Sequence, residues 1–565
     1  MKKHITGAGL LSMALLVAAP AWAQSERETL EVLRQTTLSL IETLVEAGAL
    51  TREKADALVK KAAGEAAKKL AAQKDAPAPV RVHYVPEIVR NEIREQIKQE
   101  VIAQARTERW AEPNAIPAWL DSIRWEGDLR LRYQLDDFAA GNSTPANYAF
   151  AAGTSTPNFP LSGDTTRAAE LAAVNNSSNR IPTANTTEKR ERHRLRARIG
   201  LLAKISPEWS AGVRLATGSA TDRVSTNQTL GQDWNRYAFL VDRAFVRYDP
   251  VESLSLVGGR IPNPWFSTDL VWDDDLNFEG MALTWKPLRD NAAFKPFLTA
   301  GAFPVKEENP PASSGRWMHG VQAGAQWDIR SDTRFKFGLA WYGFRNFEGR
   351  VENDAVYDAS VSLPNSSAYG QYEYGRNLRQ KGNTLFVTNA SAELNDPFAP
   401  AYKTAYWGLA SRFRPLNLTA SLAFARFDPV HVILTADWVK NTAFDRNEIA
   451  ARTAGRVNLA DGKNHGYQYR LTLGRPQLRN LHDWQVALAY RYLGSDAVVD
   501  AFTDSDFGGG GTNLKGYTLG FQYAVDRNAA VGLRWLSADQ IDSFAPGAGL
   551  KFSLDVLQAD VNVRF

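Results

Sequence analysis

The chain has 565 residues, with 66 lysines and arginines against 62 aspartates and glutamates, and its mean hydropathy is negative. It contains no cysteine, which excludes disulfides, and a net charge of +4 gives no support for a nucleic-acid partner. Its 40 glycines, 16 tryptophans and 18 tyrosines fit a membrane β-barrel with aromatic girdles and polar loops.

Residues 1–23 have the pattern of a secretory signal peptide. Lys2 and Lys3 precede an apolar stretch over residues 7–19, and residues 21–23 form a small-x-small cleavage site before Gln24. The apolar stretch is shorter than the ~20 residues that a spanning helix needs. We therefore expect an exported mature chain without a transmembrane helix.

Residues 24–112 are predicted to form a periplasmic helical segment. Apolar residues recur at helical spacing over residues 30–47, 55–62 and 89–101, and the prolines of residues 76–79 form a linker. Fifteen acidic and fifteen basic residues give this segment a balanced surface, which argues against nucleic acid as its partner. Two alternatives remain: a helical hairpin, and a coiled coil that oligomerises the barrels or contacts peptidoglycan.

Residues 113–565 are predicted to be an all-β transmembrane barrel. Seven short and eight long links separate about sixteen antiparallel strands, as in bacterial barrels with short periplasmic turns and long outer loops. Residues 402–413 also look like a strand, and we place them inside a long outer loop. The alternative is that they pair with residues 385–394, which raises the number to about eighteen. Either number leaves room for an aqueous channel.

The last nine residues, 557–565, alternate strictly between apolar and polar side chains and end on Phe565. A terminal strand that ends in an aromatic residue resembles the signal that the outer-membrane assembly machinery reads in Gram-negative barrels. We therefore expect Phe565 to be an assembly signal. The expected partners are the barrel assembly machinery and the lipid of the outer membrane.

The same alternation predicts which side chains face the lumen. Over residues 190–201 one face carries His193, Leu195 and Ile199, while the other carries an unbroken row of arginines from Arg190 to Arg198. An arginine on the lipid side costs about 2–4 kcal/mol at the bilayer midplane, so all of them are placed in the lumen. The predicted pore-lining set is Arg124, Arg130, Arg132, Arg190, Arg192, Arg194, Arg196, Arg198, Arg243 and Arg247. These arginines either brace loops by ion pairing or form a cationic wall that attracts anions.

An acidic segment follows the fifth predicted strand and supplies candidates for a constriction loop: Asp269, Asp273, Asp274, Asp275 and Glu279. Calcium binding is one interpretation, but the EF-hand spacing is missing. A solvated acidic loop is the second. The third is a loop that folds into the barrel and faces the arginines. We expect no cofactor and no metal.

The order of signal peptide, helical segment, proline linker and long barrel resembles the putative porin family of Gram-negative bacteria. Residues 45–55, 259–264, 272–280 and 437–441 are similar to segments that recur in this family. The resemblance implies an outer-membrane channel for passive diffusion, commonly a trimer. It implies neither a substrate nor ligand residues.

Together these patterns predict a water-filled porin for small hydrophilic solutes and ions, with a mild preference for anions. An enzyme is not expected, because the chain has only seven histidines and the five near strands have no evident serine partner. The alternatives are a substrate-selective channel and a structural protein that tethers the envelope through its periplasmic helices.

Overall fold

The computed structural model describes residues 60, 122–144, 185–287, 292–307, 315–351, 372–375, 378–388, 407–454, 463–542 and 549–565. The predicted signal peptide and, apart from Lys60, the predicted helical segment lie outside these residues. Within the described part of the chain, no helix is both long and apolar enough to cross a membrane.

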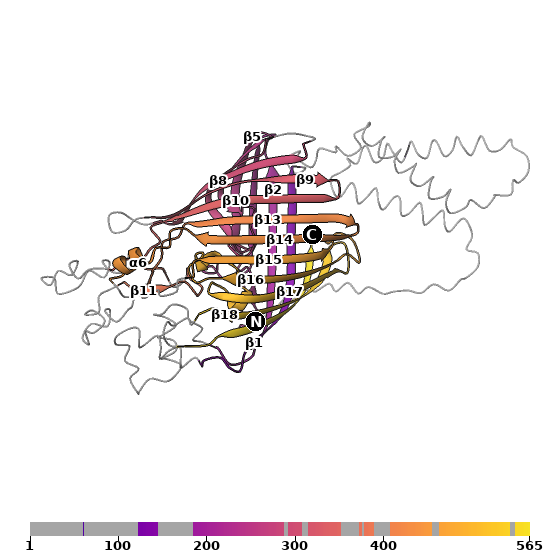
Figure 1. Ribbon diagram of the computed structural model, residues 1–565. Coiled ribbons are helices and arrows are strands. Elements are labelled where there is room, and N and C mark those ends of the chain that lie inside the picture. Colours follow the sequence, from indigo (N-terminus) through magenta and orange to yellow (C-terminus); the bar gives the residue numbers. More distant parts are fainter. Residues whose placement is uncertain are drawn as a thin grey trace, which may run out of the picture. The chain divides into compact units, whose positions relative to one another are not determined.

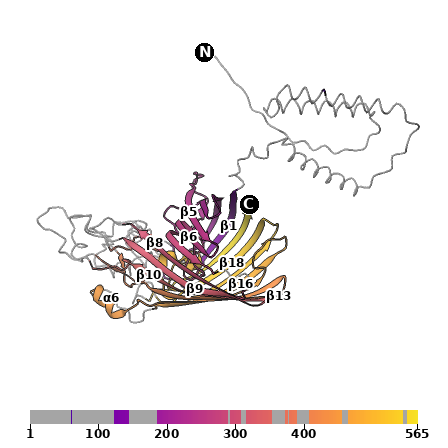
Figure 2. The same ribbon diagram turned by 90° about the horizontal axis from the view of Figure 1, so that it is seen from above.

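Sixteen long antiparallel strands form a closed barrel (Figures 1 and 2), because the last strand pairs with the first. Turns and long links alternate along the chain. The strands are β1 (Ile123–Phe138), β2 (Arg190–Lys204), β3 (Trp209–Ala216), β5 (Leu240–Val251), β6 (Leu254–Pro262), β7 (Asn277–Trp285), β8 (Phe294–Lys306), β9 (Arg316–Arg330), β10 (Thr333–Arg345), β13 (Pro415–Phe427), β14 (Val430–Asn441), β15 (His465–Gly474), β16 (Trp484–Leu493), β17 (Leu514–Ala524), β18 (Ala529–Gln540) and β19 (Ser553–Arg564).

The predicted number of sixteen spanning strands is confirmed, and the alternative of about eighteen is wrong. Residues 385–394 and 402–413 do contribute strands that pair, β11 (Leu385–Val387) and β12 (Trp407–Leu409), but these form a separate two-stranded sheet. Three residues are too few for a spanning strand, which needs about 9–11. A further short strand, β4 (Gln228–Thr229), pairs with β2 inside a long link.

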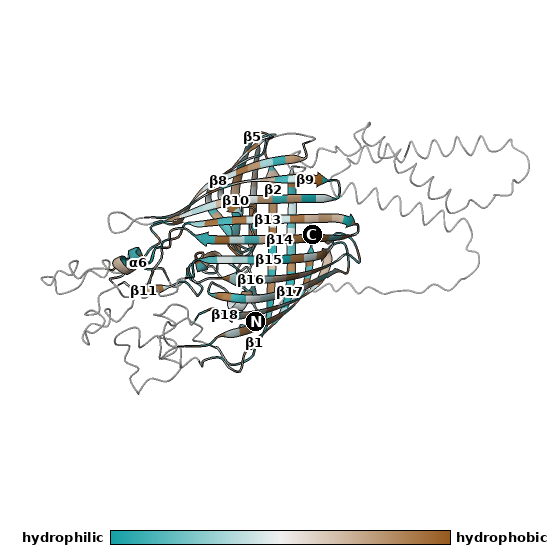
Figure 3. Cartoon of the chain, in the orientation of Figure 1, coloured by the Kyte–Doolittle hydropathy of each residue, from teal (hydrophilic) through white to brown (hydrophobic). Residues whose placement is uncertain are grey.

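The two faces of the wall follow the period of two (Figure 3). Along β9, buried Arg316, Met318 and Gln322 alternate with exposed residues, and along β10 buried Ala340 and Tyr342 do the same. Large apolar side chains are exposed on the opposite, outer face, among them Leu129, Leu131, Ile199, Val246, Leu339 and Leu434. The outer face therefore suits contact with lipid, and the buried side chains point into the barrel.

The closing seam joins the C-terminal residue to β1. The backbone N–H of Gly127 donates to the carbonyl oxygen of Phe565 at 3.0 Å, and the N–H of Phe565 donates back at 3.1 Å. A Cβ atom at residue 127 would lie 2.3 Å from the Phe565 ring, so the ring can pack here only because residue 127 is glycine. The last residue thus completes the ladder of hydrogen bonds that removes the sheet's free edges.

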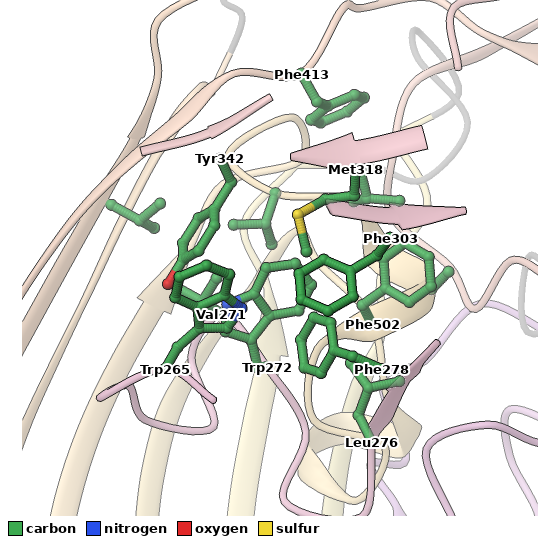
Figure 4. Close-up of a cluster of buried hydrophobic side chains, with 14 of the residues drawn as sticks. Trp265, Val271, Trp272, Leu276, Phe278, Phe303, Met318, Tyr342, Phe413 and Phe502 are labelled. Atoms are coloured by element: carbon green, nitrogen blue, oxygen red, sulfur yellow. The ribbon is translucent and has the colours of Figure 1, made fainter. Parts of the chain in front are cut away.

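A hydrophobic core lies inside the barrel, against strands β6 to β10. Inward side chains of the wall, such as Phe303 and Tyr342, pack with Trp265, Trp272 and Phe502 from the links (Figure 4). The rings of Trp272 and Tyr342 meet edge to face with centroids 5.0 Å apart. Burial of these rings removes apolar surface from water on one side of the lumen.

Short helical elements also lie in the long links. Helix α6 (Arg446–Arg452) begins after Asp445, whose side chain accepts hydrogen bonds from the backbone N–H groups of Asn447 and Glu448. Two 3₁₀ turns, η5 (Asp500–Phe502) and η6 (Phe507–Gly509), shape the link between β16 and β17.

Candidate functional site: the charged lumen

One loop, residues 263–276 between β6 and β7, crosses the interior of the barrel, and we call it the crossing loop. The amide of Gln322 on β9 holds the backbone of Phe266 with two hydrogen bonds of 2.8 Å. The hydroxyl of Thr268 donates to Asp437 on β14 at 2.6 Å. The loop therefore reaches strands far from those that flank it.

Aspartates of the crossing loop attach it to arginines on two parts of the wall. The carboxylate of Asp269 lies 3.0 Å from Arg470 on β15 and 2.9 Å from Arg491 on β16. Burial opposes its ionisation, but the charges of the two arginines outweigh this effect and hold the pKa of Asp269 below its ordinary value. Asp275 lies 3.1 Å from Arg198 on β2, so the loop spans from β16 to β2.

The other two aspartates of the loop have no arginine within ion-pair distance in the described chain. Asp273 is buried and accepts a hydrogen bond from the backbone of Ser505 at 2.9 Å. Burial, followed by the charge of nearby Asp504, raises the pKa of Asp273. Asp274 is exposed at its surface. Desolvation by the surrounding protein, followed by the charge of Asp269, raises the pKa of Asp274 to about 6. Asp273 therefore carries less negative charge near neutral pH than an ordinary aspartate, whereas Asp274 loses its charge only as the pH falls through about 6.

Glu279 lies elsewhere. It belongs to strand β7 rather than to the crossing loop, and its carboxylate pairs with Arg260 on β6 at 2.5 Å. Its side chain is 60% exposed, and the neighbouring Met281 on the same face is exposed as well. This ion pair therefore lies on the outer face of the barrel.

A second loop, residues 494–513 between β16 and β17, also enters the barrel, although its sequence predicts only one of the long polar links. Its Asp504 lies 2.9 Å from Arg491, and its Asp506 lies 3.1 Å from Arg132 and 3.3 Å from Arg534. Burial opposes the ionisation of Asp506, but the neighbouring arginines lower its pKa. The signal in the sequence was the run of aspartates at residues 496, 500, 504 and 506, followed by four glycines.

A third segment, residues 378–388, packs against the second loop. The side chain of Asn383 donates to the carbonyl oxygen of Val498 at 2.8 Å, and the hydroxyl of Thr384 donates to Asp496 at 2.6 Å. Lys381 is buried and donates to the carbonyl oxygen of Gly508 at 2.6 Å, and its burial lowers its pKa to about 7. Segments far apart in the sequence therefore interlock inside the barrel.

The structure divides the predicted pore-lining arginines into three groups. Four form ion pairs with carboxylates of the wall or the loop: Arg132 with Asp560, Arg192 with Asp136, and Arg196 and Arg198 each with Asp128 and Asp275. Arg124 and Arg190 are exposed near the strand ends. Four others have no carboxylate oxygen within 4.0 Å in the described chain: Arg130, Arg194, Arg243 and Arg247.

Strand residues at one end of the lumen line an open pocket of about 460 Å³. Its lining includes Arg124, Arg243 and Arg247, together with Glu126 and Asp249. Arg214, also in this pocket, pairs with Asp242. In the described chain no group of three or more His, Asp or Glu side chains is arranged to hold a metal ion.

Comparison with known proteins places this barrel in a family. The family model described as putative porin matches residues 34–565. Comparison with curated protein sequences gives no match.

Among solved structures, OmpF of Salmonella typhi in complex with daunomycin matches with 10% identity and a TM-score of 0.36, covering 78% of this chain and 97% of that one. The outer membrane channel DcaP of Acinetobacter baumannii matches with 10% identity and a TM-score of 0.37, covering 78% of this chain and 97% of that one. The loop L8 deletion mutant of OmpT of Vibrio cholerae matches with 9% identity and a TM-score of 0.36, covering 79% of this chain and 100% of that one. Similarities at this level carry no argument about the lumen. The family match covers most of the chain and the described strands close into a sixteen-stranded barrel, so the chain belongs to the putative porin family and is an outer-membrane channel protein.

Proposed function

We propose that the protein is a water-filled channel for passive diffusion of small hydrophilic solutes, with a mild preference for anions. The observation that carries this proposal is the unequal neutralisation of charge in the lumen. Four inward arginines, Arg130, Arg194, Arg243 and Arg247, have no carboxylate partner in the described chain. Uncompensated cations in a narrow passage raise the local concentration of anions.

The acidic loop does not cancel this excess. Asp269 and Asp275 are engaged by arginines, and their charge is already balanced within the lumen. Burial raises the pKa of Asp273, which lowers its negative charge near neutral pH. The aspartates of the loop therefore leave the four unpaired arginines without a carboxylate partner.

Single-channel recording in planar lipid bilayers tests the proposal. With a salt gradient of potassium chloride, the reversal potential should have the sign that a higher permeability for chloride gives. A reversal potential of the opposite sign would refute the anion preference. A protein that inserts but conducts no current would refute the open channel as well.

The finer expectations belong to the same proposal. The chain would consist of a signal peptide (1–23), a periplasmic helical segment (24–112) and the barrel, which would assemble as a trimer. Phe565 would be the residue that the barrel assembly machinery recognises. Its exposed side chain, 67% accessible beside Gly127, supports this role, because recognition requires access.

A further inference from the structure

The arginines on β1 and β2 differ in whether a carboxylate holds them. Arg132 is held by Asp560 at 2.7 Å and by Asp506 at 3.1 Å, and Arg196 is held by Asp128 at 2.9 Å. Between these fixed side chains lie Arg130 and Arg194. We propose that Arg130 and Arg194 form a binding site for an oxyanion group, either a carboxylate or a phosphate, on solutes that pass through the channel.

The strand register brings the two arginines together. Arg130 lies opposite Arg196, and Arg132 lies opposite Arg194. Arg130 and Arg194 are therefore diagonal neighbours on the same face of two paired strands. Residues in this relation lie about 7–8 Å apart at their backbones, which is within reach of two long side chains. Both side chains are only half-buried, so a solute in the lumen can reach them.

The protein orients these guanidinium groups without neutralising them. One terminal nitrogen of Arg130 donates to the side-chain oxygen of Asn227, and Nη1 of Arg194 donates to the side-chain oxygen of Gln134 at 3.3 Å. Both acceptors are uncharged amides. Each guanidinium uses one terminal nitrogen in these hydrogen bonds, and in the described chain its buried Nε has no hydrogen-bond partner, so the donors of each group are not all engaged by the protein.

The nearest carboxylates are already engaged. Asp560 and Asp506 both bind Arg132, and Asp275 binds Arg198. Neither Arg130 nor Arg194 has a carboxylate within ion-pair distance in the described chain, so both can offer positive charge to a ligand. A guanidinium presents parallel N–H groups that match the two oxygens of a carboxylate or phosphate, whereas chloride offers no such pair of acceptors. The site should favour oxyanions over chloride.

This inference rests on the proposed anion-conducting channel and makes a prediction that a charged wall alone does not make. Conductance should saturate as potassium phosphate or potassium acetate is raised, while it should rise in proportion to potassium chloride. Saturation with either oxyanion supports the site and shows which chemistry it prefers. Conductance that rises in proportion to both salts would overturn the site, even if the channel prefers anions.

Variants locate the site. Arg130→Gln and Arg194→Gln should each raise the half-saturating oxyanion concentration about tenfold or more. This is the loss of affinity expected when a hydrogen bond to a charged group is removed. Arg243→Gln is the matched control: it removes one unpaired arginine from the same lumen at β5, and should change the half-saturating concentration less than about twofold while still lowering anion preference. Equal effects of all three variants would overturn the site in favour of a diffuse positive field.

Two further measurements protect the result against a folding defect. Each variant should keep the heat-modifiable electrophoretic mobility of the native barrel. Arg130→Lys keeps the charge but not the parallel N–H groups. It should therefore keep the anion preference but raise the half-saturating concentration of the oxyanion. Unchanged saturation in Arg130→Lys and Arg130→Gln together would exclude Arg130 from the site.

Discussion

Replacing Asp269 with asparagine removes the carboxylate that holds the crossing loop to two strands. Asp269 contacts Arg470 at 3.0 Å and Arg491 at 2.9 Å, and the Arg491 side chain is only 6% exposed. Loss of one partner from a buried ion pair costs about 3–5 kcal/mol. Because the Arg470 side chain is 34% exposed and screened by water, we take the lower end, about 3 kcal/mol. This cost raises the undocked fraction of the loop about 100-fold.

Planar-bilayer recording measures the consequence. Asp269→Asn should show larger conductance fluctuations, because the loop leaves the wall more often. It should also show a higher ratio of chloride to potassium permeability, because Arg470 loses its carboxylate partner while Arg491 keeps Asp504. Glu279→Gln is the matched control: it also removes a carboxylate from an arginine pair, but on the outer face. If the two variants and the unmodified protein gave the same fluctuations and the same permeability ratio, the assignment of Asp269 as an anchor of the loop would be refuted.

Three further outcomes are expected. Lowering the pH from 7.5 to 5 should raise the chloride-to-potassium permeability ratio, because Asp274, with a pKa of about 6, loses its negative charge as the pH falls; Asp274→Asn should reduce this change. Gly127→Val should displace the Phe565 ring and lower the amount of folded barrel in outer-membrane fractions, and an unchanged amount would contradict the packing at the seam. Trp272→Ala should cost about 3–5 kcal/mol of packing and lower the temperature at which the barrel unfolds on gels, whereas Trp234→Ala, at a site 99% exposed, should not.

The wall of the barrel was predictable because lipid imposes a simple rule on it. Each strand must place apolar side chains outward, so the period of two assigns a face to every residue, and a one-residue shift would move the arginines of β2 into lipid. The number of strands followed from the alternation of short and long links. The short segment at residues 402–413 was ambiguous because its local pattern suits a strand, whereas only its three-residue pairing shows that it does not span.

The interior was less predictable, because the contacts there join residues that are distant in the sequence. The partner of Arg132 in the second loop is Asp506, 374 residues away, and no local pattern identifies such a pair. The division of the arginines into paired and unpaired groups depends on these contacts. Helix α6 had a local signal, since Asp445 can cap it and Glu448 and Arg452 are spaced to pair across one turn.

The seam between β1 and β19 also limits the order of events in folding. Arg132 and Asp560, whose ion pair lies across the seam, are 428 residues apart in the chain. Contacts of such separation form slowly, because the entropy of closing a long loop must be met before the contacts stabilise it. Strand β1 therefore keeps an open edge until strand β19 has been made and pairs with it. During that interval the chain is exposed to wrong pairing, which is a reason for an assembly factor to hold the first strand until the last one docks.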